Sequence, residues 1–115
     1  RLKSLIHDYI LLSYKTSAKF PKSEIYYMSS QVRRAALSVM LNYIEGYGRM
    51  KPAVMANFFE ISFASLKESI YVFFLAKNLS YIDGAEYEKL YLFKEEIARM
   101  LWRTIRGIKR KNFSQ

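Results

Sequence analysis

The sequence predicts an all-α fold, an antiparallel up-down-up-down four-helix bundle that forms one domain over residues 1–115. Apolar residues recur at steps of three and four residues in four successive segments, which is the period of one helix face. The predicted connections are short, and short connections make consecutive helices antiparallel neighbours. The chain also has only 4 Gly and 2 Pro, too few for a fold with many turns.

The first helix is predicted over residues 2–20 and ends at Pro21, because proline disfavours helical geometry in the residue before it. Its apolar stripe is Leu5, Tyr9, Leu12, Thr16 and Phe20. The second helix is predicted to begin at Ser23, a favourable N-cap, and to stop at the Gly46-Tyr-Gly48 pair. Small residues crowd this helix, so we expect a neighbouring helix to approach it closely. Its inner stripe is Met28, Val32, Ala35, Val39, Asn42 and Gly46.

The third helix is predicted over residues 52–79, with Pro52 in the first turn, where proline is tolerated. It is apolar most of the way round, which predicts either a central position or a subunit interface. The fourth helix is predicted to begin with Asp83 as N-cap and Glu86 three residues later, the capping-box pattern. Its apolar stripe runs from Leu90 to Ile108, and we expect the residues after Ile108 to fray.

Composition excludes several classes of protein. There is no Cys and only one His (His7), so disulfides, thiolate metal sites, cysteine nucleophiles and catalysis by a pair of histidines are excluded. No apolar stretch approaches the roughly 20 residues of a spanning helix, and no signal peptide is visible, so we expect a cytoplasmic protein without membrane contact. The formal net charge of +9 favours an acidic partner, most often nucleic acid.

The end of the fourth helix carries most of this charge. Six basic residues and no acid lie between residues 99 and 111: Arg99, Arg103, Arg106, Lys109, Arg110 and Lys111. The four arginines share one helix face, offset from the apolar stripe, and we call them the arginine stripe; all six form the basic segment. Arginine pairs bidentately with phosphate oxygens, so a row of arginines suits a polyanion. The alternative is a solvated helix face whose cations favour the helix dipole.

A second cluster lies on the second helix. Arg33 and Arg34, with Lys51 beyond the helix, could extend a phosphate-binding surface. We interpret the polar and glycine residues that follow as fixing the end of the helix, and not as a catalytic group. An ion pair is expected between Glu45 and Arg49, which are four residues apart. The polar and glycine residues of this group are Asn42, Glu45, Gly46, Gly48 and Arg49.

The second helix also carries the most specific resemblance in the chain. The patterns Gln31-x-Arg-Arg-Ala-Ala-x-Ser38 and Asn42-x-x-Glu-Gly-x-Gly-Arg49 resemble the signature of the 23S rRNA intervening-sequence proteins. Segments 58–68 and 76–90 also resemble that family. Two departures are Tyr43-Ile44, where the family has Ile-Ala, and Ser62-Phe63-Ala64, where it has Ala-Arg-Gly.

The resemblance implies a small all-α bundle of bacterial origin with no enzymatic activity. It also implies a ring-like homo-oligomer, with five copies in related proteins. A similar basic pentamer is the accessory protein of diversity-generating retroelements, where it binds nucleic acid and a reverse transcriptase. Periodicity and charge alone do not predict the number five.

No residue pattern supports an enzyme. The glutamates are scattered, the Glu-x-x-His pattern of di-iron bundles is absent, and we predict no catalytic residue, metal or cofactor. Arg1 precedes His7 at a spacing found in bundle-shaped ribonucleases, which leaves a nuclease as a third reading. The second reading is a protein-interaction scaffold, such as a partner of a reverse transcriptase. The function that the sequence favours over these two is a homo-oligomeric bundle that binds RNA or DNA electrostatically with low sequence specificity.

Overall fold

The computed structural model describes residues 1–114, with side chains described through residue 111. Within these residues the chain forms four α-helices, one 3-10 helix and no strand, which confirms the predicted all-α fold of four helices. The elements are α1 (Leu2–Ser17), η1 (Lys22–Glu24), α2 (Met28–Tyr47), α3 (Pro52–Asn78) and α4 (Gly84–Ser114).

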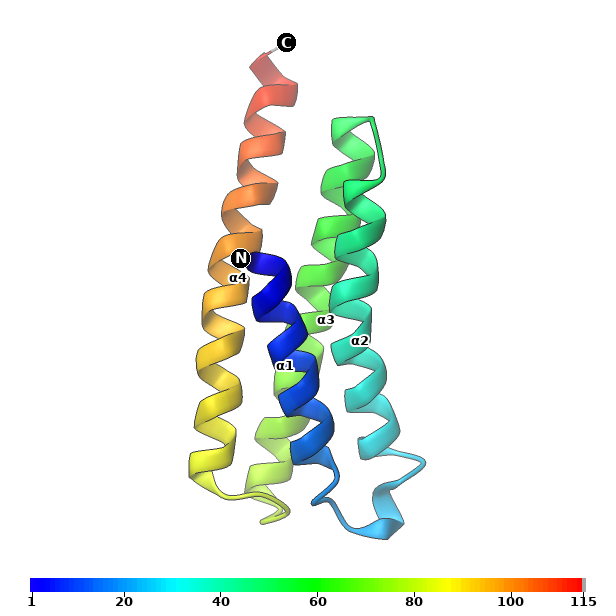
Figure 1. The fold of residues 1–115 in the computed structure, drawn as a ribbon, viewed down its shortest axis with the longest axis vertical. Coiled ribbons are helices and arrows are strands. Elements are labelled where there is room, and N and C mark those ends of the chain that lie inside the picture. The colour runs from blue at the N-terminus through cyan, green and yellow to red at the C-terminus, as the bar shows by residue number, and fades with distance from the viewer. Residues whose placement is uncertain (115) are drawn as a thin grey trace.

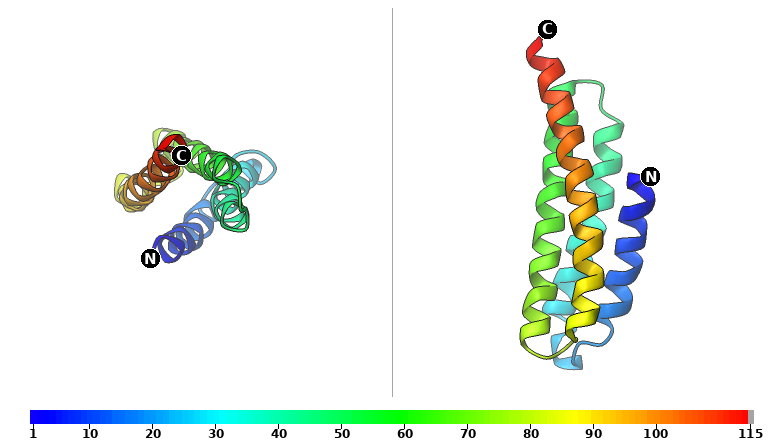
Figure 2. Two further views of the ribbon diagram at one scale, coloured as in Figure 1. Left: turned by 90° about the horizontal axis from the view of Figure 1, so that it is seen from above. Right: turned by 90° about the vertical axis from the view of Figure 1, so that its left-hand side faces the viewer.

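The helices lie side by side along the long axis of a molecule that measures 51 × 24 × 20 Å. Figure 1 shows the chain descending along α1, ascending along α2, descending along α3 and ascending along α4. The helix α1 packs against α2 and α4, and α3 packs against the same two helices. Helices α1 and α3 therefore occupy one diagonal of the bundle, as the end-on view in Figure 2 shows.

The core contains one polar link across this diagonal. The hydroxyl groups of Tyr9 on α1 and Ser69 on α3 lie 2.6 Å apart, and both residues are fully buried. Burial raises the pKa of the Tyr9 phenol well above its usual value, so this hydroxyl stays protonated at neutral pH. The Ser13 hydroxyl donates to the Tyr9 carbonyl. Because a buried polar group without a partner is destabilising, the contact with Ser69 is what allows the Tyr9 phenol to lie in the core, and the Tyr9 carbonyl serves the buried Ser13 hydroxyl.

Helices α2 and α3 pack closely through small residues, as the sequence predicted for α2. An ideal Cβ atom built on Gly46 would lie 2.6 Å from Cε1 of Phe59, so only glycine allows this approach. The Ser62 hydroxyl donates to the Val39 carbonyl at 2.6 Å. The Ser38 and Ser65 hydroxyls lie 2.9 Å apart, and the Asn42 amide donates to the Ser38 carbonyl and hydroxyl.

The predicted boundary between the first two helices was wrong. Helix α1 ends at Ser17 and not at Phe20, although Phe20 still reaches the core. Ser23 caps no helix. The residues after Pro21 form the 3-10 helix, and α2 begins only at Met28, with no side-chain cap. The connection therefore covers residues 18–27 rather than the two residues expected.

The physical reason lies in local turns and one long-range contact. The Glu24 N–H donates to the Pro21 carbonyl at 2.9 Å and the Ile25 N–H to the Lys22 carbonyl at 3.1 Å, which closes a 3-10 turn instead of the first turn of an α-helix. The Glu24 carboxylate then accepts a hydrogen bond from the Tyr81 hydroxyl at 2.8 Å, so it serves the distant α3–α4 connection.

The capping box at the start of α4 is confirmed. The Glu86 N–H donates to the Asp83 carboxylate and the Asp83 N–H donates to the Glu86 carboxylate, each at 2.8 Å. Lys19 forms an ion pair with Glu86, and with the Asp83 N–H it lowers the pKa of Glu86. Helix α3 ends as predicted, and Ser80 takes a left-handed conformation with φ 63° in the turn that follows.

Helix α4 does not fray after Ile108; it continues as α-helix to Ser114. It has 31 residues, whereas α1 has 16. Figures 1 and 2 show the consequence, because the N-terminus lies partway along α4 and the C-terminal half of α4 rises beyond it.

Replacing Gly46 with Ala tests the close packing of α2 and α3. The added methyl group meets the Phe59 ring and forces a shift, so we expect the free energy of unfolding to fall by about 1–3 kcal/mol. Urea denaturation followed by circular dichroism measures it. Gly107→Ala is the matched control, because a Cβ atom there meets nothing within 4 Å, and it should leave stability equal or higher. Equal losses in the two variants would contradict the packing explanation.

Candidate nucleic-acid interface

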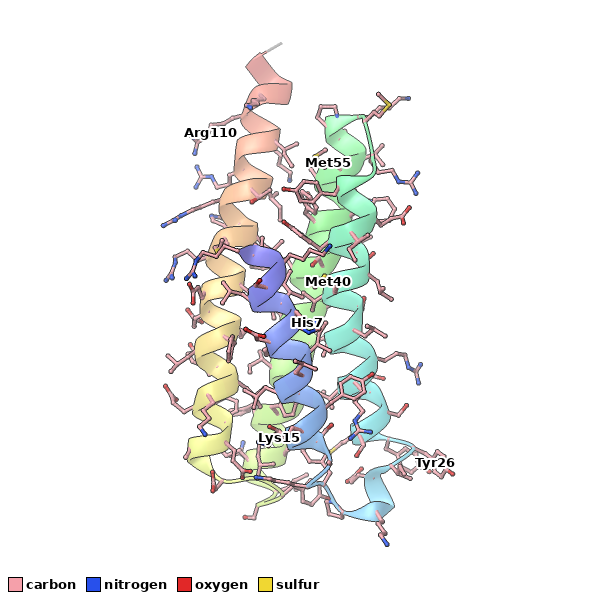
Figure 3. All side chains as sticks on the ribbon, viewed as in Figure 1. His7, Lys15, Tyr26, Met40, Met55 and Arg110 are labelled. Atoms are coloured by element: carbon pink, nitrogen blue, oxygen red, sulfur yellow. The ribbon has the colours of Figure 1, made fainter. Side chains whose placement is uncertain are left out.

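The six residues of the basic segment are all exposed on α4. On the opposite side of the same helix, Ile97, Leu101 and Ile105 are buried in the core. This division follows from the spacing of the arginines, which places them away from the apolar stripe. Figure 3 shows nitrogen-bearing side chains projecting from the upper half of α4 on the side away from the other helices, with Arg110 labelled among them. The four arginines therefore form one cationic face of α4, and Lys109 and Lys111 lie on either side of it.

Along the long axis of the bundle, the basic segment of α4 extends past the N-terminal end of α1. Arg1 forms an ion pair with Glu96, so the N-terminus is held at a level of α4 just before Arg99. Lys109 forms an ion pair with Glu60 of α3 at 2.9 Å, and the Arg106 guanidinium lies 5.9 Å from the centre of the Trp102 ring. One cation of the segment is therefore compensated by an acid, and another is placed over an aromatic ring.

The basic residues predicted on or after α2 do not join this surface as a group. Arg33 is half-buried: its Nε donates to the Ser17 hydroxyl at 2.8 Å and its Nη2 to the Tyr14 carbonyl at 3.2 Å. Its guanidinium also lies 5.0 Å from the centre of the Tyr14 ring. Arg33 thus clamps the end of α1 to α2. Arg34 is exposed and donates to Ser30.

Lys51 lies at the same end of the bundle as the basic segment. It is exposed and immediately precedes α3, which begins at the upper end of the molecule in Figure 1. Arg33 and Arg34 lie instead in the first two turns of α2, toward the lower end. Of the three residues, only Lys51 is near the basic segment along the long axis.

Of the residues read as fixing the end of α2, three make contacts at that end: Glu45, Gly48 and Arg49. Glu45 and Arg49 form the expected ion pair, and the Arg49 guanidinium lies 5.0 Å from the centre of the Phe58 ring on α3. Gly48 ends the helix in a right-handed conformation, with its N–H directed at the carbonyls of Ile44 and Glu45. With Asn42 and Gly46 already placed in the α2–α3 contact, this cluster has a structural role.

The described residues contain no group of three or more His, Cys, Asp or Glu side chains that could hold a metal ion. His7 is exposed on α1, and Arg1, its candidate ribonuclease partner, is already paired with Glu96. None of the helices within residues 1–114 is long and apolar enough to cross a membrane.

An open groove of about 570 Å³ lies between α1 and α4. Its centre is apolar, with Leu11 and Leu92 well exposed. Acidic and basic residues flank this centre: Asp8, Glu96, Lys15 and Lys89. Polar groups do not converge in this groove as they do in a small-molecule site.

One residue of the surface was missed by the sequence analysis. Trp102 is the only tryptophan of the chain and is half exposed beside the basic segment, where it contacts Phe63 of α3. The sequence could have indicated this residue through its spacing, because Trp102 lies one helical turn before Arg106 and the guanidinium therefore lies near the ring.

The family model described as 23S rRNA-intervening sequence protein matches residues 4–103. This chain belongs to that family. The match extends from α1 into α4 and includes Arg99 and Arg103, whereas Arg106, Lys109, Arg110 and Lys111 lie beyond it.

A solved structure supports the fold of this intervening-sequence protein. The chain is similar to the crystal structure of a protein with unknown function from the S23 ribosomal protein family of Bacteroides thetaiotaomicron VPI-5482. The TM-score is 0.82 at 22% sequence identity, over 91% of this chain and 98% of that chain. The search of curated proteins finds no match.

Arg33 and Arg34 are adjacent residues of this intervening-sequence protein for which the structure predicts different outcomes. Arg33→Ala removes two hydrogen bonds and a cation–aromatic contact, so we expect the free energy of unfolding to fall by about 1–3 kcal/mol. Arg34→Ala, the matched control, should change it by less than about 0.5 kcal/mol. Urea denaturation of both variants measures the difference, and similar losses would exclude the clamp.

Proposed function

We propose that this protein binds nucleic acid, RNA or DNA, through electrostatic contact between the basic segment of α4 and phosphate groups. It acts as a non-enzymatic, cytoplasmic, homo-oligomeric binding protein with low sequence specificity. The observation that carries the proposal is the exposure of all six basic residues of this segment on one helix that has no acid within the same stretch.

The geometry of the arginine stripe suits a polyanion better than a small anion. Arg99 and Arg110 are eleven residues apart, so the stripe extends for about 16 Å along the helix at 1.5 Å per residue. A linear row of this length can contact several consecutive phosphates, and each neutralised phosphate releases counterions. The stripe lies on the outer surface of the bundle, and phosphate contacts carry no base information, which supports low sequence specificity.

Exposed apolar residues support assembly into a homo-oligomer. Leu37, Leu41 and Ile44 lie three to four residues apart on α2 and are 39–55% exposed. The groove between α1 and α4 is a second apolar surface, on different helices. Contact between two different surfaces of identical chains generates a ring when the rotation closes. We propose a ring of five copies, the number that the family resemblance implies, so that the basic segment is repeated and binds with avidity.

A second candidate function is a protein-interaction scaffold, such as an accessory partner of a reverse transcriptase. The groove between α1 and α4 favours it, because its exposed leucines and flanking charges of both signs suit a protein chain. In that case nucleic-acid binding is weak with a shallow salt dependence, whereas protein binding is tight.

Reversing three charges of the arginine stripe tests the first function. The variant is Arg99→Glu/Arg103→Glu/Arg110→Glu, which leaves the contact between Arg106 and Trp102 intact. We expect its affinity for structured RNA and for mixed-sequence duplex DNA to fall at least about tenfold at moderate salt. The slope of log affinity against log salt should become about three units less steep, one unit for each phosphate that is no longer neutralised. Fluorescence anisotropy across a salt series measures both quantities.

The matched control reverses three exposed cations outside both the basic segment and the α1–α4 groove, Lys3→Glu/Lys22→Glu/Arg34→Glu, and therefore changes the net charge by the same amount. It should keep most of the affinity and slope if the location of the charge matters, and light scattering checks that both variants assemble alike. A stripe variant that binds as tightly as the wild type would eliminate α4 as the phosphate-contacting surface. Equal losses in both variants would show that only net charge is sensed.

Leu41→Glu tests the apolar residues of α2 as a subunit contact. A charge placed in an apolar interface is strongly unfavourable, so we expect dissociation to smaller species in size-exclusion chromatography with light scattering. Ile25→Glu is the matched control, because Ile25 is equally exposed at 55% but lies in the α1–α2 connection. The proposed contact fails if Leu41→Glu keeps the wild-type mass, or if the wild type is itself a monomer.

A further inference from the structure

Trp102 occupies an unusual place for the only tryptophan of a small bundle. Its side chain lies on α4 between the arginine stripe and helix α3, and 51% of the residue is exposed. The exposed part of the ring adds nothing to the core, while its other part is supported by Phe63, which is half-buried on α3. The indole is therefore a supported ring with a surface open to solvent.

Two cation–aromatic pairs meet at this point. The Arg106 guanidinium lies 5.9 Å from the centre of the Trp102 ring, and the Lys67 ammonium lies 5.9 Å from the centre of the Phe63 ring. The two ring centres are 6.2 Å apart with the planes tilted by 45°. Each cation is four residues after its ring on the same helix, so the helices present two rings with a cation beside each.

A negative group nearby is already compensated. Glu60 lies one turn before Phe63 on α3, and its carboxylate pairs with Lys109 at 2.9 Å. The positive charges of Arg106 and Lys67 therefore dominate the surroundings of the two rings. This combination, aromatic faces with cations beside them, matches a nucleotide, which has a flat base and a phosphate.

A second aromatic group lies farther along the same two helices. Phe74 of α3 contacts Tyr87 of α4, with ring centres 5.9 Å apart, and the Lys77 ammonium lies 5.1 Å from the Tyr87 ring centre. Lys94 lies 5.3 Å from the ring centre of Tyr91. Tyr91 and Trp102 are eleven residues apart on α4, or about 16 Å along the helix. The seam between α3 and α4 thus carries aromatic rings with cations at two levels.

We infer that Trp102 and Phe63 form a stacking site for unpaired bases, with Arg106 and Lys67 holding the adjoining phosphates, so that the protein selects single-stranded segments of RNA or DNA. The inference rests on the proposed nucleic-acid binding and deepens it by naming the substrate class. Bases inside a duplex have both faces covered by neighbouring pairs, so a duplex offers an indole only its two terminal pairs, whereas every unpaired base of a single strand can stack. Stacking tolerates any base, which agrees with low sequence specificity.

The intrinsic fluorescence of Trp102 tests the inference directly, because no other tryptophan contributes to the signal. The probes are 12-nucleotide oligo(dT), 12-nucleotide oligo(rU), an abasic 12-mer with the same phosphates, and a blunt 12-base-pair duplex. We expect oligo(dT) or oligo(rU) to quench the tryptophan emission saturably, the abasic strand not to do so, and the duplex, which exposes only its two terminal pairs, to do so far more weakly. The difference between the DNA and RNA arms identifies which of the two is preferred.

Variants measured by anisotropy with labelled oligonucleotides separate stacking from charge. Trp102→Ala should weaken binding of the 12-mer strands by about five- to a hundred-fold, the usual effect of removing one base–aromatic stack, with an unchanged salt slope. Its affinity for the abasic strand should not change. Trp102→Phe keeps a ring and should recover part of the affinity. Tyr26→Ala is the matched control, because Tyr26 is 85% exposed but lies in the α1–α2 connection (Figure 3) and should bind like the wild type.

The outcomes distinguish this inference from the function on which it rests. If the strands bind with a steep salt slope but Trp102→Ala binds as tightly as the wild type, stacking is excluded and the electrostatic function stands. Equal affinity for the abasic and base-bearing strands would likewise exclude stacking and leave the electrostatic function standing. If no nucleic acid binds in a salt-dependent way, the proposed function fails as well. If the emission shifts to the blue as protein concentration rises and no oligonucleotide quenches it, a second copy covers Trp102 and the inference is wrong.

Discussion

The close contact between α2 and α3 is the constraint on which the rest of the structure depends. Gly46 leaves no side chain between the α2 backbone and the Phe59 ring. Serine hydrogen bonds along the same seam, one between two hydroxyls and one to the Val39 carbonyl, satisfy polar groups that this proximity buries. Small residues fix the distance between the two helices, because interiors are packed too densely to accept an added atom. Since α3 is held by α2, the side of α3 that receives α4 is also held, and with it Phe63 and Lys67.

Because α4 is longer than α1, its basic segment is not covered by α1. Lys19 pairs with Glu86 at one end of α1 and Arg1 pairs with Glu96 at the other, so α1 runs beside α4 only up to the level of Glu96. The basic segment of α4 follows at once and projects beyond α1 (Figure 2). Six cations on one stretch of helix repel one another, and the ion pair between Lys109 and Glu60 relieves part of this repulsion. A row of phosphates would relieve more, which gives a physical reason for affinity to a polyanion.

Local patterns predicted the elements well where local interactions decide them, and failed where they do not. The capping box of Asp83 and Glu86 involves two residues three apart, and both of its hydrogen bonds form. Ser23 has the same intrinsic preference for an N-cap, yet the 3-10 turn after Pro21 takes its place. The Glu24 carboxylate accepts a hydrogen bond from the Tyr81 hydroxyl. That partner is 57 residues away, so no local pattern could identify it.

For the candidate site, the motifs of the second helix were enough to indicate the family. The spacing of the arginines was enough to place them on one face, because a helix of fixed period converts spacing into direction. It did not distinguish Arg33 from Arg34, although one clamps α1 and the other faces solvent. It also did not show that Trp102 meets Phe63, since these residues lie on different helices. Those roles depend on which helices pack together, and packing is set by shape and by buried contacts between segments far apart in the chain.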